Sequence, residues 1–371
     1  MELIVIIHLL SFSLLYFTMI VIFITGWRKI ITREPVTAIE KLPNVSVIVP
    51  FRNEESSLPL LLQSLKQQHY TNFEVLLIDD HSTDNSVNAA KSVISSDTRF
   101  KIIKLDDEEG KKAAQREGVK NAQSNFLLFT DADCTLGLNW IQHMVSAMIT
   151  EKAAFVSSRI EYTETRGFFS KLLYLEFQSL IATGAAAISL NRASLCNGAS
   201  MAVQKELYPA LTEIEGAERS SGDDIFMMHH LKRKGGTIVF NASPEASVKT
   251  SGPKTFGAFL RQRVRWASKS GSYHDFDSIF QGIIVLFMCI AIITSVLLAF
   301  SGVLSWWVPM AVFLTKTGCD FAFLLSYLQH YNKSKYLWYI VPVELLYPIY
   351  IIMVGILSLF WHPLWKGRKI R

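Results

Sequence analysis

A long apolar run near the start of the chain limits what this protein can fold into. From Leu3 to Gly26 the sequence contains no Asp, Glu, Lys or Arg. A helix of this length crosses a hydrocarbon core about 30 Å thick. An aromatic residue and three cations follow the run: Trp27, Arg28, Lys29 and Arg33. Such residues favour the cytoplasm for the C-terminal end of the span, so we predict a transmembrane anchor over residues 1–27.

The alternative for this run is a cleaved signal peptide. No basic residue precedes the run, the run is long for a signal peptide, and no small-residue cleavage site follows it. These three departures favour an anchor that stays in the mature protein.

A second apolar region occupies residues 278–371, which we assign to about three membrane helices. The predicted spans are Ile279–Phe300, Trp306–Leu328 and Leu337–Phe360. Within the second span, Lys316 and Asp320 lie four residues apart on one helix face, where they can neutralise each other or form a proton or ion path. Three residues interrupt the third span: Pro342, Glu344 and Pro348.

The number of spans conflicts with the charge at the end of the chain. If the first span ends in the cytoplasm, four spans place the C-terminus outside. The last six residues nevertheless carry four cations, which favour the inside: Lys366, Arg368, Lys369 and Arg371. Either the last segment is not a simple span or the charge rule does not hold for this chain.

Composition argues against several other classes of protein. Half of the residues are hydrophobic, and the net charge of +5 comes partly from residues that flank spans, so nucleic acid is not an expected partner. The four cysteines, at positions 134, 196, 289 and 319, have no spacing typical of zinc sites or disulfide frameworks. We therefore expect an integral protein of the plasma (inner) membrane whose working domain faces the reducing cytoplasm.

Between residues 40 and 277 the pattern changes to short apolar runs that alternate with helical periodicity. The expected strands are Val45–Pro50, Phe73–Ile78, Lys101–Leu105 and Asn125–Phe129. The expected helices are Leu58–Gln68, a segment rich in Ala and Val after Asp84, and Ala113–Ala122. This alternation predicts an α/β domain with a mainly parallel sheet.

Polar residues follow three of the expected strands. They are Pro50–Glu55, Asp79–Ser82, and the pair Asp131 and Asp133. In parallel sheets ligands bind beyond the carboxyl ends of the strands. One such segment would be an ordinary loop, but three at one edge indicate a site.

The pair Asp131 and Asp133 is the strongest candidate for a metal site. In an extended segment, residues two apart point to the same side, so both carboxylates can face one point. Two hard oxygen ligands suit Mg²⁺ or Mn²⁺, with water and a diphosphate as the remaining ligands. The alternative is a pair of solvated turn residues.

Five motifs occur in the order typical of one enzyme family. They are Val47–Glu55, Ile78–Asp84, Asp131–Asp133, Gly222–Asp224 and Gln262–Trp266. Together they resemble the motifs of membrane-bound family 2 glycosyltransferases over about residues 44–270. The resemblance implies a GT-A fold and a nucleotide-sugar donor. Over a shorter stretch, Asp223–Met227 and the basic, Trp-containing segment after it also resemble ceramide glucosyltransferase.

The resemblance implies roles on the donor side of the site. The donor-binding residues would be Pro50, Glu54, Asp79, Asp80, Lys111, Asp131 and Asp133. In the family the second acid of the Asp-x-Asp motif contacts the metal more directly, which here is Asp133, and the first faces the ribose. Asp80, with Asp79 as the alternative, would read the uracil or ribose. The family often has Asn where this chain has Arg116.

The resemblance also implies a base and an acceptor side. Asp224 matches the general base, which must reach the acceptor hydroxyl, and Asp223 is its acidic neighbour, where the family usually has Glu. The alternative is a pair of acids that stabilises a helix N-terminus. On the acceptor side lie Gly198, Gln262, Arg265 and Trp266. Without the other motifs, the Arg-Trp pair would be typical of an interfacial anchor.

The expected function is the transfer of a sugar from a UDP-sugar to a membrane lipid or lipid-linked acceptor, and the family resemblance implies that transfer occurs with inversion. The cofactor would be Mg²⁺ or Mn²⁺. The apolar stretch Phe168–Leu190, expected as a buried or an interfacial helix, would keep the site near the bilayer. Two alternatives remain: a processive polysaccharide synthase, for which four spans are few, and a membrane transporter or sensor that only binds nucleotides.

Overall fold

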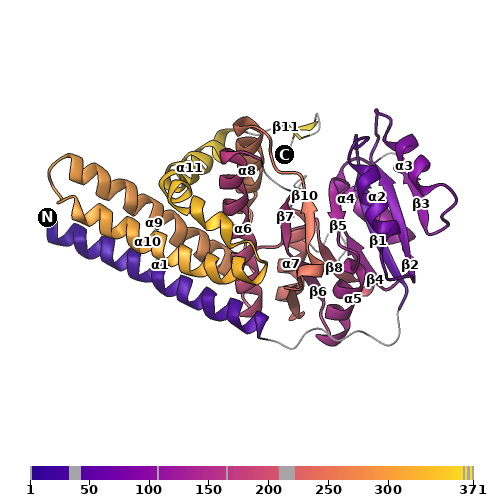
Figure 1. The fold of residues 1–371 in the computed structure, drawn as a ribbon, viewed down its shortest axis with the longest axis horizontal. Coiled ribbons are helices and arrows are strands. Elements are labelled where there is room, and N and C mark those ends of the chain that lie inside the picture. The colour runs from indigo at the N-terminus through magenta and orange to yellow at the C-terminus, as the bar shows by residue number, and fades with distance from the viewer. Residues whose placement is uncertain are drawn as a thin grey trace. The chain divides into compact units, whose positions relative to one another are not determined.

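The structure is a computed structural model, and it divides into two compact units made of alternating parts of the chain. It describes residues 2–32, 43–106, 108–163, 166–208 and 222–361, and the backbone of 364–365 and 368–369. Unit 1 comprises Met1–Thr32, Thr165–Arg192 and Pro253–Pro363. Unit 2 comprises Arg33–Glu164, Ala193–Gly252 and Leu364–Arg371. Figure 1 labels the elements of both units. Arg33 and the side chains of the basic tail, Lys366 to Arg371, lie outside the described residues.

Unit 2 is built on a seven-stranded sheet in the order β3-β2-β1-β4-β8-β6-β9. Its strands are β1 Val45–Phe51, β2 Phe73–Asp79, β3 Phe100–Lys104, β4 Phe126–Phe129, β6 Phe155–Ser158, β8 Met201–Gln204 and β9 Ile238–Asn241. β1 pairs in parallel with β2 and β4, as do β2 with β3 and β6 with β9, whereas β8 is antiparallel to β4 and β6. The predicted mainly parallel α/β sheet is therefore confirmed.

The central strands form because every side chain in them can be buried. All seven residues of β1 and all seven of β2 are buried, as expected for strands covered on both faces. The helices of unit 2 are α2 Leu58–Lys66, α3 Ser86–Ile94, α4 Lys111–Asn121, α5 Trp140–Thr150 and α7 Asp223–Arg233, with short 3₁₀ helices η1 Lys205–Leu207 and η3 Pro244–Ala246. α2 buries the leucines whose spacing predicted it: Leu58, Leu61, Leu62 and Leu65.

A second, three-stranded sheet was not expected from the sequence. Its strands are β5 Cys134–Leu136, β10 Val248–Thr250 and β7 Ile160–Tyr162, in the order β5-β10-β7. Each strand has three residues, too few for a period-two pattern to stand out. The sheet matters for the site because it brings Thr250, at the end of β10, beside the start of β5.

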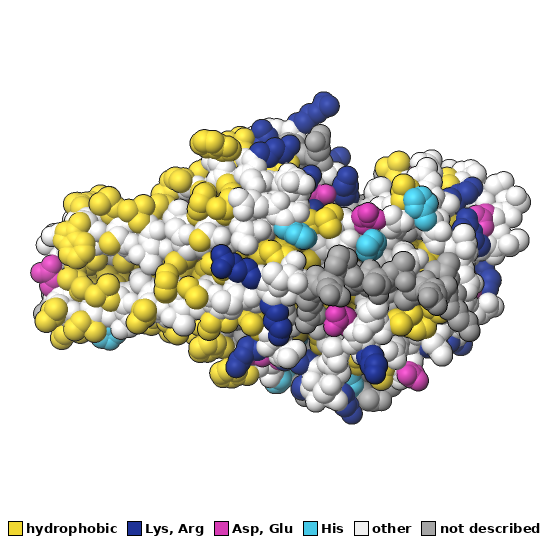
Figure 2. All heavy atoms as spheres, turned by 60° about the horizontal axis from the view of Figure 1, so that its bottom comes forward, with side chains coloured by type: hydrophobic (Ala, Val, Ile, Leu, Met, Phe, Trp, Pro, Cys, Tyr) yellow, Lys and Arg dark blue, Asp and Glu magenta, His cyan; other side chains and the backbone are white. Residues whose placement is uncertain are grey.

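Unit 1 is helical. Its helices are α1 Glu2–Ile31, α6 Phe168–Ser189, α8 Phe256–Ser270, α9 Phe276–Phe300, α10 Trp307–His330 and α11 Ile340–Phe360, the last preceded by the 3₁₀ helix η4 Ser334–Tyr339. In Figure 1, α1, α9 and α10 lie side by side. Their outer surface is covered with hydrophobic side chains, drawn in yellow in Figure 2. Such a surface suits lipid rather than water.

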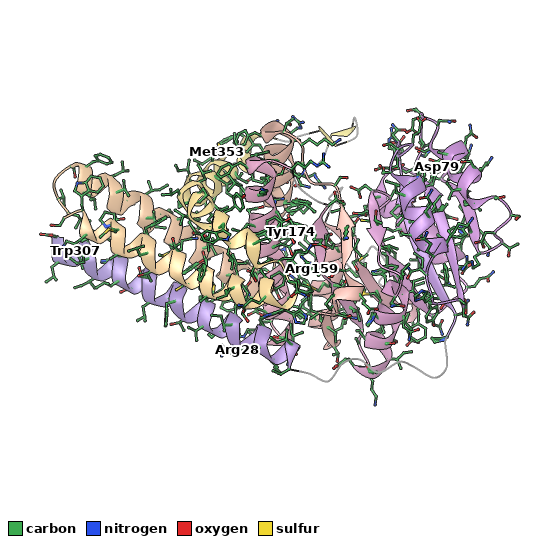
Figure 3. The ribbon with its side chains drawn as sticks, in the orientation of Figure 1. Arg28, Asp79, Arg159, Tyr174, Trp307 and Met353 are labelled. Carbon is green, nitrogen blue, oxygen red and sulfur yellow. The ribbon has the colours of Figure 1, made fainter. Side chains whose placement is uncertain are left out.

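Within the part of the chain that the structure describes, five helices are long and apolar enough to cross a membrane: α1, α6, α9, α10 and the segment of η4 and α11. α6 differs from the others in its burial. Of an 18-residue apolar stretch of α6, 72% is buried inside the protein, whereas the buried share is 39% or less in the other four helices. Tyr174 of α6, labelled in Figure 3, stacks on Tyr336 of η4 with ring centroids 3.8 Å apart. The structure thus favours the buried alternative for this stretch.

Chain connectivity shows that α6 is not a simple crossing. β6 and β4 precede α6 in the chain, β8 follows it, and β8 pairs with both in one sheet. A single crossing would separate these strands by the bilayer. Both ends of α6 therefore lie on the same side of any membrane.

α11 shows signs of not being a simple crossing either. Pro348 lies inside it, where the missing N–H and the ring disturb a helix. Two residues further on, the Tyr350 hydroxyl donates to Glu176 of α6 at 3.0 Å, and the Tyr350 ring lies 5.3 Å from that of Phe259 on α8. The middle of α11 thus contacts α6, which lies between β7 and β8 in the chain, and α8, which follows β10. This favours the first explanation of the charge conflict, in which the last segment is not a simple span.

The two units differ from a division into consecutive domains. Residues 40–277 as one domain would include α6 and α8, whereas these helices pack within unit 1. α6 packs within unit 1 because its surface is apolar. It approaches α1 closely, since the Ser189 hydroxyl of α6 donates to the carbonyl of Gly26 on α1 at 2.7 Å. The boundaries 1–27, 40–277 and 278–371 stay a prediction.

The close approach of α1 and α6 yields a test of stability. A Cβ at Gly26 would lie 2.7 Å from the carbonyl oxygen of Ala186, so one helix must move. We expect Gly26→Ala to lower the unfolding free energy by about 1–3 kcal/mol, measured as a lower thermal midpoint in detergent. The matched control is Gly318→Ala on α10, where an added Cβ meets nothing within 4 Å. Equal midpoints for the two variants would contradict this packing.

Candidate active site

The site forms at the carboxyl ends of β1, β2 and β4. Because these strands are parallel neighbours, their ends meet at one edge of the sheet. Phe51, the last residue of β1, is opposite Asp79, the last residue of β2, which Figure 3 labels. The structure thus brings the predicted residues Pro50, Asp79 and Asp80 to the same edge.

Asp80 is 2% exposed, and its carboxylate connects three segments. It accepts a hydrogen bond from the backbone N–H of Gly110 at 3.1 Å, just before α4. Arg52, after β1, lies 4.0 Å from the carboxylate and donates to the carbonyl of Asp80 at 3.2 Å. Asp79 accepts from the N–H of Ser82 at 3.0 Å. These contacts fix the loop after β2 against its neighbours.

His81 adds a charge-sensitive contact that sequence reasoning did not single out. Its φ is +57°, and its ring lies 2.9 Å from the carbonyl of Asp106 and 3.3 Å from the carboxylate of Asp80. Because both partners are acceptors, they favour the protonated ring and raise the pKa of His81. A positive charge is thereby favoured beside Asp80.

The segment that carries Asp131 and Asp133 is a turn and not an extended strand. The N–H of Cys134 donates to the carbonyl of Asp131 at 3.1 Å. The geometric premise that alternation along a strand orients the two carboxylates is therefore wrong. The two groups still interact: partial loss of water around the carboxyl, and then the negative charges of Asp131 and Glu54, raise the pKa of Asp133 to about 6, although the residue as a whole is exposed.

Asp133 is held by the second sheet. Its carboxylate accepts a hydrogen bond from the hydroxyl of Thr250 at 3.1 Å, across 117 positions of sequence. Thr250 had no signal in the sequence because it lies in a three-residue strand far along the chain. Its contact orients one of the two predicted metal ligands.

Lys111 joins the donor-side acids to the acids of α7. Its ammonium pairs with Asp131. Burial alone would lower the pKa of Lys111, but the negative charges of Asp131, Asp223 and Asp224 outweigh burial and raise it. Next to it, Lys112 lies 3.4 Å from Asp223. Two consecutive lysines at the start of α4 therefore connect the Asp-x-Asp segment to the Asp-Asp pair.

The pair Asp223 and Asp224 occupies the first turn of α7, after Gly222 with a φ of +103°. The alternative reading, acids at a helix N-terminus, is thus true of their placement. Asp224 accepts hydrogen bonds from the N–H groups of Gly198 at 2.7 Å and Ile225 at 2.9 Å. A Cβ at Gly198 would lie 3.3 Å from that of Asp224. The structure therefore brings Gly198 to the predicted base.

Glu54 lies close enough to Asp133 for its charge to act there, and it accepts a hydrogen bond from the Ser57 hydroxyl. Gln262, Arg265 and Trp266 lie on α8 in unit 1. Their place on the acceptor side of the site stays a prediction.

Asp131 and Asp133 fit a divalent cation that takes its other ligands from water and a diphosphate. They do not form a complete protein site, because among the residues that the structure describes no group of three or more His, Cys, Asp or Glu side chains could hold a metal. Two carboxylates with an excess of negative charge at Asp133 are what Mg²⁺ or Mn²⁺ needs when water and a diphosphate complete its shell.

The mainly parallel sheet of unit 2 has the GT-A type of fold. A solved structure with this fold is the mannosyltransferase PcManGT from Pyrobaculum calidifontis in complex with GDP-Man and Mn²⁺, with a TM-score of 0.59 and 14% identity over 96% of this chain and 99% of that one. Residues 46–207 match the family model for glycosyl transferase family 2. The chain therefore contains a glycosyl transferase family 2 domain.

Sequence relatives carry related names. An N-acetylglucosaminyltransferase of Azorhizobium caulinodans is 27% identical over 64% of this chain and 62% of its own length. An N-acetylglucosaminyltransferase of Rhizobium meliloti is 24% identical over 76% of this chain and 72% of its own. The UDP-Glc:alpha-D-GlcNAc-diphosphoundecaprenol beta-1,3-glucosyltransferase WfgD of Escherichia coli is 28% identical over 35% and 50%. The match thus spans less than two thirds of the first and third of these relatives.

Proposed function

We propose that this protein is a membrane-anchored glycosyltransferase that moves a sugar, with inversion, from a UDP-sugar to a membrane lipid or lipid-linked acceptor. The observation that carries the proposal is the position of Lys111 among Asp131, Asp223 and Asp224. This position supports the proposal because one positive charge pairs with Asp131 and is also acted on by the charges of Asp223 and Asp224.

The nucleotide end of the donor would bind at the ends of β1 and β2. Asp80 or Asp79 offers carboxylate oxygens to the hydroxyl and N–H groups of a nucleoside, and Pro50 and Glu54 line the neighbouring strand end. The contacts of Asp80 with Gly110 and Arg52 hold this surface in place before the donor arrives, which lowers the entropic cost of binding.

Asp133, with Asp131, would hold Mg²⁺ or Mn²⁺ near the diphosphate. A bound divalent cation stabilises the negative charge that develops on a leaving diphosphate. Thr250 keeps the Asp133 carboxylate oriented, and Lys111 adds a second positive charge on the same side. The neighbour of known structure was solved with GDP-Man and Mn²⁺, which supports a metal-dependent donor site here.

Asp224 would act as the general base. The acceptor hydroxyl loses its proton to Asp224 as its oxygen forms a bond to the anomeric carbon, while the bond from that carbon to the diphosphate breaks. The N–H of Gly198 fixes one oxygen of Asp224. A single displacement needs no covalent enzyme intermediate.

The acceptor is proposed to carry a hydrophobic tail, such as a diacylglycerol, sphingolipid, carotenoid or polyprenyl phosphate. α8, with Gln262 and Trp266, ends at Ser270, and the apolar helix α9 begins at Phe276. This short connection keeps α8 near the bilayer, where a lipid acceptor reaches it by lateral diffusion. The name of WfgD describes a lipid-linked acceptor for that relative. The catalytic unit would face the cytoplasm at the plasma (inner) membrane.

The metal prediction is tested by chelation and by one substitution. We expect Asp133→Ala to abolish sugar transfer, because it removes a hard ligand from a site with few protein ligands. EDTA should do the same to the wild type, and added Mn²⁺ or Mg²⁺ should restore it. Glu206→Ala, at an exposed acid of η1, is the control and should keep wild-type activity. Full activity in EDTA would refute metal dependence.

The base prediction is tested by Asp224→Asn, which keeps the shape and removes the proton acceptor. We expect the rate constant to fall by at least about a hundredfold, the usual scale for loss of a general base. Donor affinity, measured by UDP titration, should survive. Asp223→Asn should have the smaller effect. If Asp223→Asn were inactive and Asp224→Asn active, the two roles would be reversed. A transporter or sensor that only binds nucleotides would have no need for the Asp224 base.

The acceptor prediction is tested with membranes and radiolabelled UDP-sugars, extracted with organic solvent. We expect the label to enter the lipid phase, and not to do so in membranes that carry Asp224→Asn. Label found only in water-soluble product or in long polymer would contradict a lipid acceptor, and the long polymer would favour the processive synthase.

A further inference from the structure

Arg263 occupies the first of the two unspecified positions in the Gln-x-x-Arg-Trp motif, yet it is among the most buried residues of α8. It is 3% exposed. Its guanidinium forms a two-pronged ion pair with Glu176 of α6: Nε donates to one carboxylate oxygen at 2.9 Å, and a terminal nitrogen donates to the other. A charged group at this depth requires such a partner.

The same guanidinium contacts two residues of the motif. Its other terminal nitrogen donates to the side-chain oxygen of Gln262 at 2.9 Å. Its carbon lies 4.3 Å from the centre of the Trp266 ring, in cation–π geometry. Arg263 therefore contacts both ends of the motif at once, one by a hydrogen bond and the other through its flat face.

Glu176 links this arrangement to a third helix. The hydroxyl of Tyr350 on α11 donates to Glu176 at 3.0 Å, and the ring of Tyr350 lies beside that of Phe259 on α8. In Figure 1, α6, α8 and α11 lie side by side within unit 1. The carboxylate of Glu176 thus receives donors from two different helices.

We propose that Arg263 is a positioning residue for sugar transfer, which sets the side chains of Gln262 and Trp266 for the acceptor. This inference rests on the proposed function, in which these two residues lie on the acceptor side. A buried ion pair by itself contributes little net stability, since apolar residues often replace it without loss. A planar guanidinium, however, can form a two-pronged ion pair with Glu176, donate a hydrogen bond to Gln262 and lie over the ring of Trp266 at the same time. The single ammonium of a lysine cannot make all three contacts.

The sharpest test exchanges the two charges. The double variant Glu176→Arg with Arg263→Glu keeps a buried ion pair but moves the guanidinium to α6, away from its place between Gln262 and Trp266. We expect it to fold and to bind UDP like the wild type. Its kcat/KM for the acceptor should fall at least about tenfold, since a displacement of about 1 Å can cost about a hundredfold.

The matched control exchanges an ion pair of the same unit whose arginine is exposed. Arg192 and Asp277 lie 2.8 Å apart, with their side chains 62% and 14% exposed. The variant Arg192→Asp with Asp277→Arg should keep the wild-type kcat/KM for the acceptor. Arg263→Lys serves as a second variant, with the same readouts, should the buried exchange fail to fold.

A spectroscopic readout tests the positioning without turnover. The fluorescence emission of Trp266 is obtained by subtracting the emission of the same protein with Trp266→Phe from that of each protein. Acrylamide quenching of this signal should rise in the buried exchange and in Arg263→Lys, and stay unchanged in the exposed exchange. In a double-mutant cycle, Arg263→Lys and Trp266→Phe should be non-additive in acceptor kcat/KM.

Two outcomes would overturn the inference: unchanged quenching of Trp266 in a folded variant of Arg263, or unchanged acceptor kcat/KM despite altered quenching. Wild-type membranes that transfer no sugar to lipid would instead refute the proposed function. In that case the quenching experiment still decides whether Arg263 positions Trp266.

Discussion

The positive charge of Lys111 is the interaction on which the rest of the site depends. Asp131 comes from the turn after β4, whereas Asp223 and Asp224 come from the first turn of α7. Carboxylates gathered in one partly buried place repel one another. Lys111 pairs with the first of them and lies within the field of the other two, while Lys112 pairs with Asp223. The two lysines thus allow the donor-side acids and the candidate base to share one site.

The negative charge around Asp133 is not fully neutralised by the positive charge of Lys111. Its carboxylate lies in the field of the negative charges of Asp131 and Glu54, and its hydrogen bond comes from the neutral hydroxyl of Thr250. A group in this environment favours either a proton or a cation. A metal-bound diphosphate would bring a cation to this carboxylate, and this links donor binding to the completion of the site.

In unit 1, charged groups lie among apolar helices, where each needs a partner of opposite charge. α6 carries Glu176, and α8 carries Arg263; each is tolerable because the other is its partner. Lys316 on α10 is likewise paired, with Asp320 on its own helix and Glu344 on α11. Mutual neutralisation, expected for Lys316 and Asp320, therefore includes a third residue. These ion pairs join α6 to α8 and α10 to α11, and the hydrogen bond from Tyr350 to Glu176 joins α11 to α6.

The local features of this protein follow from its sequence alone. The anchor, the central strands and α2 are encoded in apolar runs and periodicities that neighbouring residues express together, and the family motifs are contiguous. Tertiary structure decided which side chains meet: Thr250 with Asp133, Lys111 with Asp131 and α7, and Arg263 with Glu176. It also showed that Asp131 and Asp133 lie in a turn. These contacts join residues as much as 117 positions apart, and no periodicity within a window of the sequence can specify such a pairing, because it depends on how the sheets and helices pack.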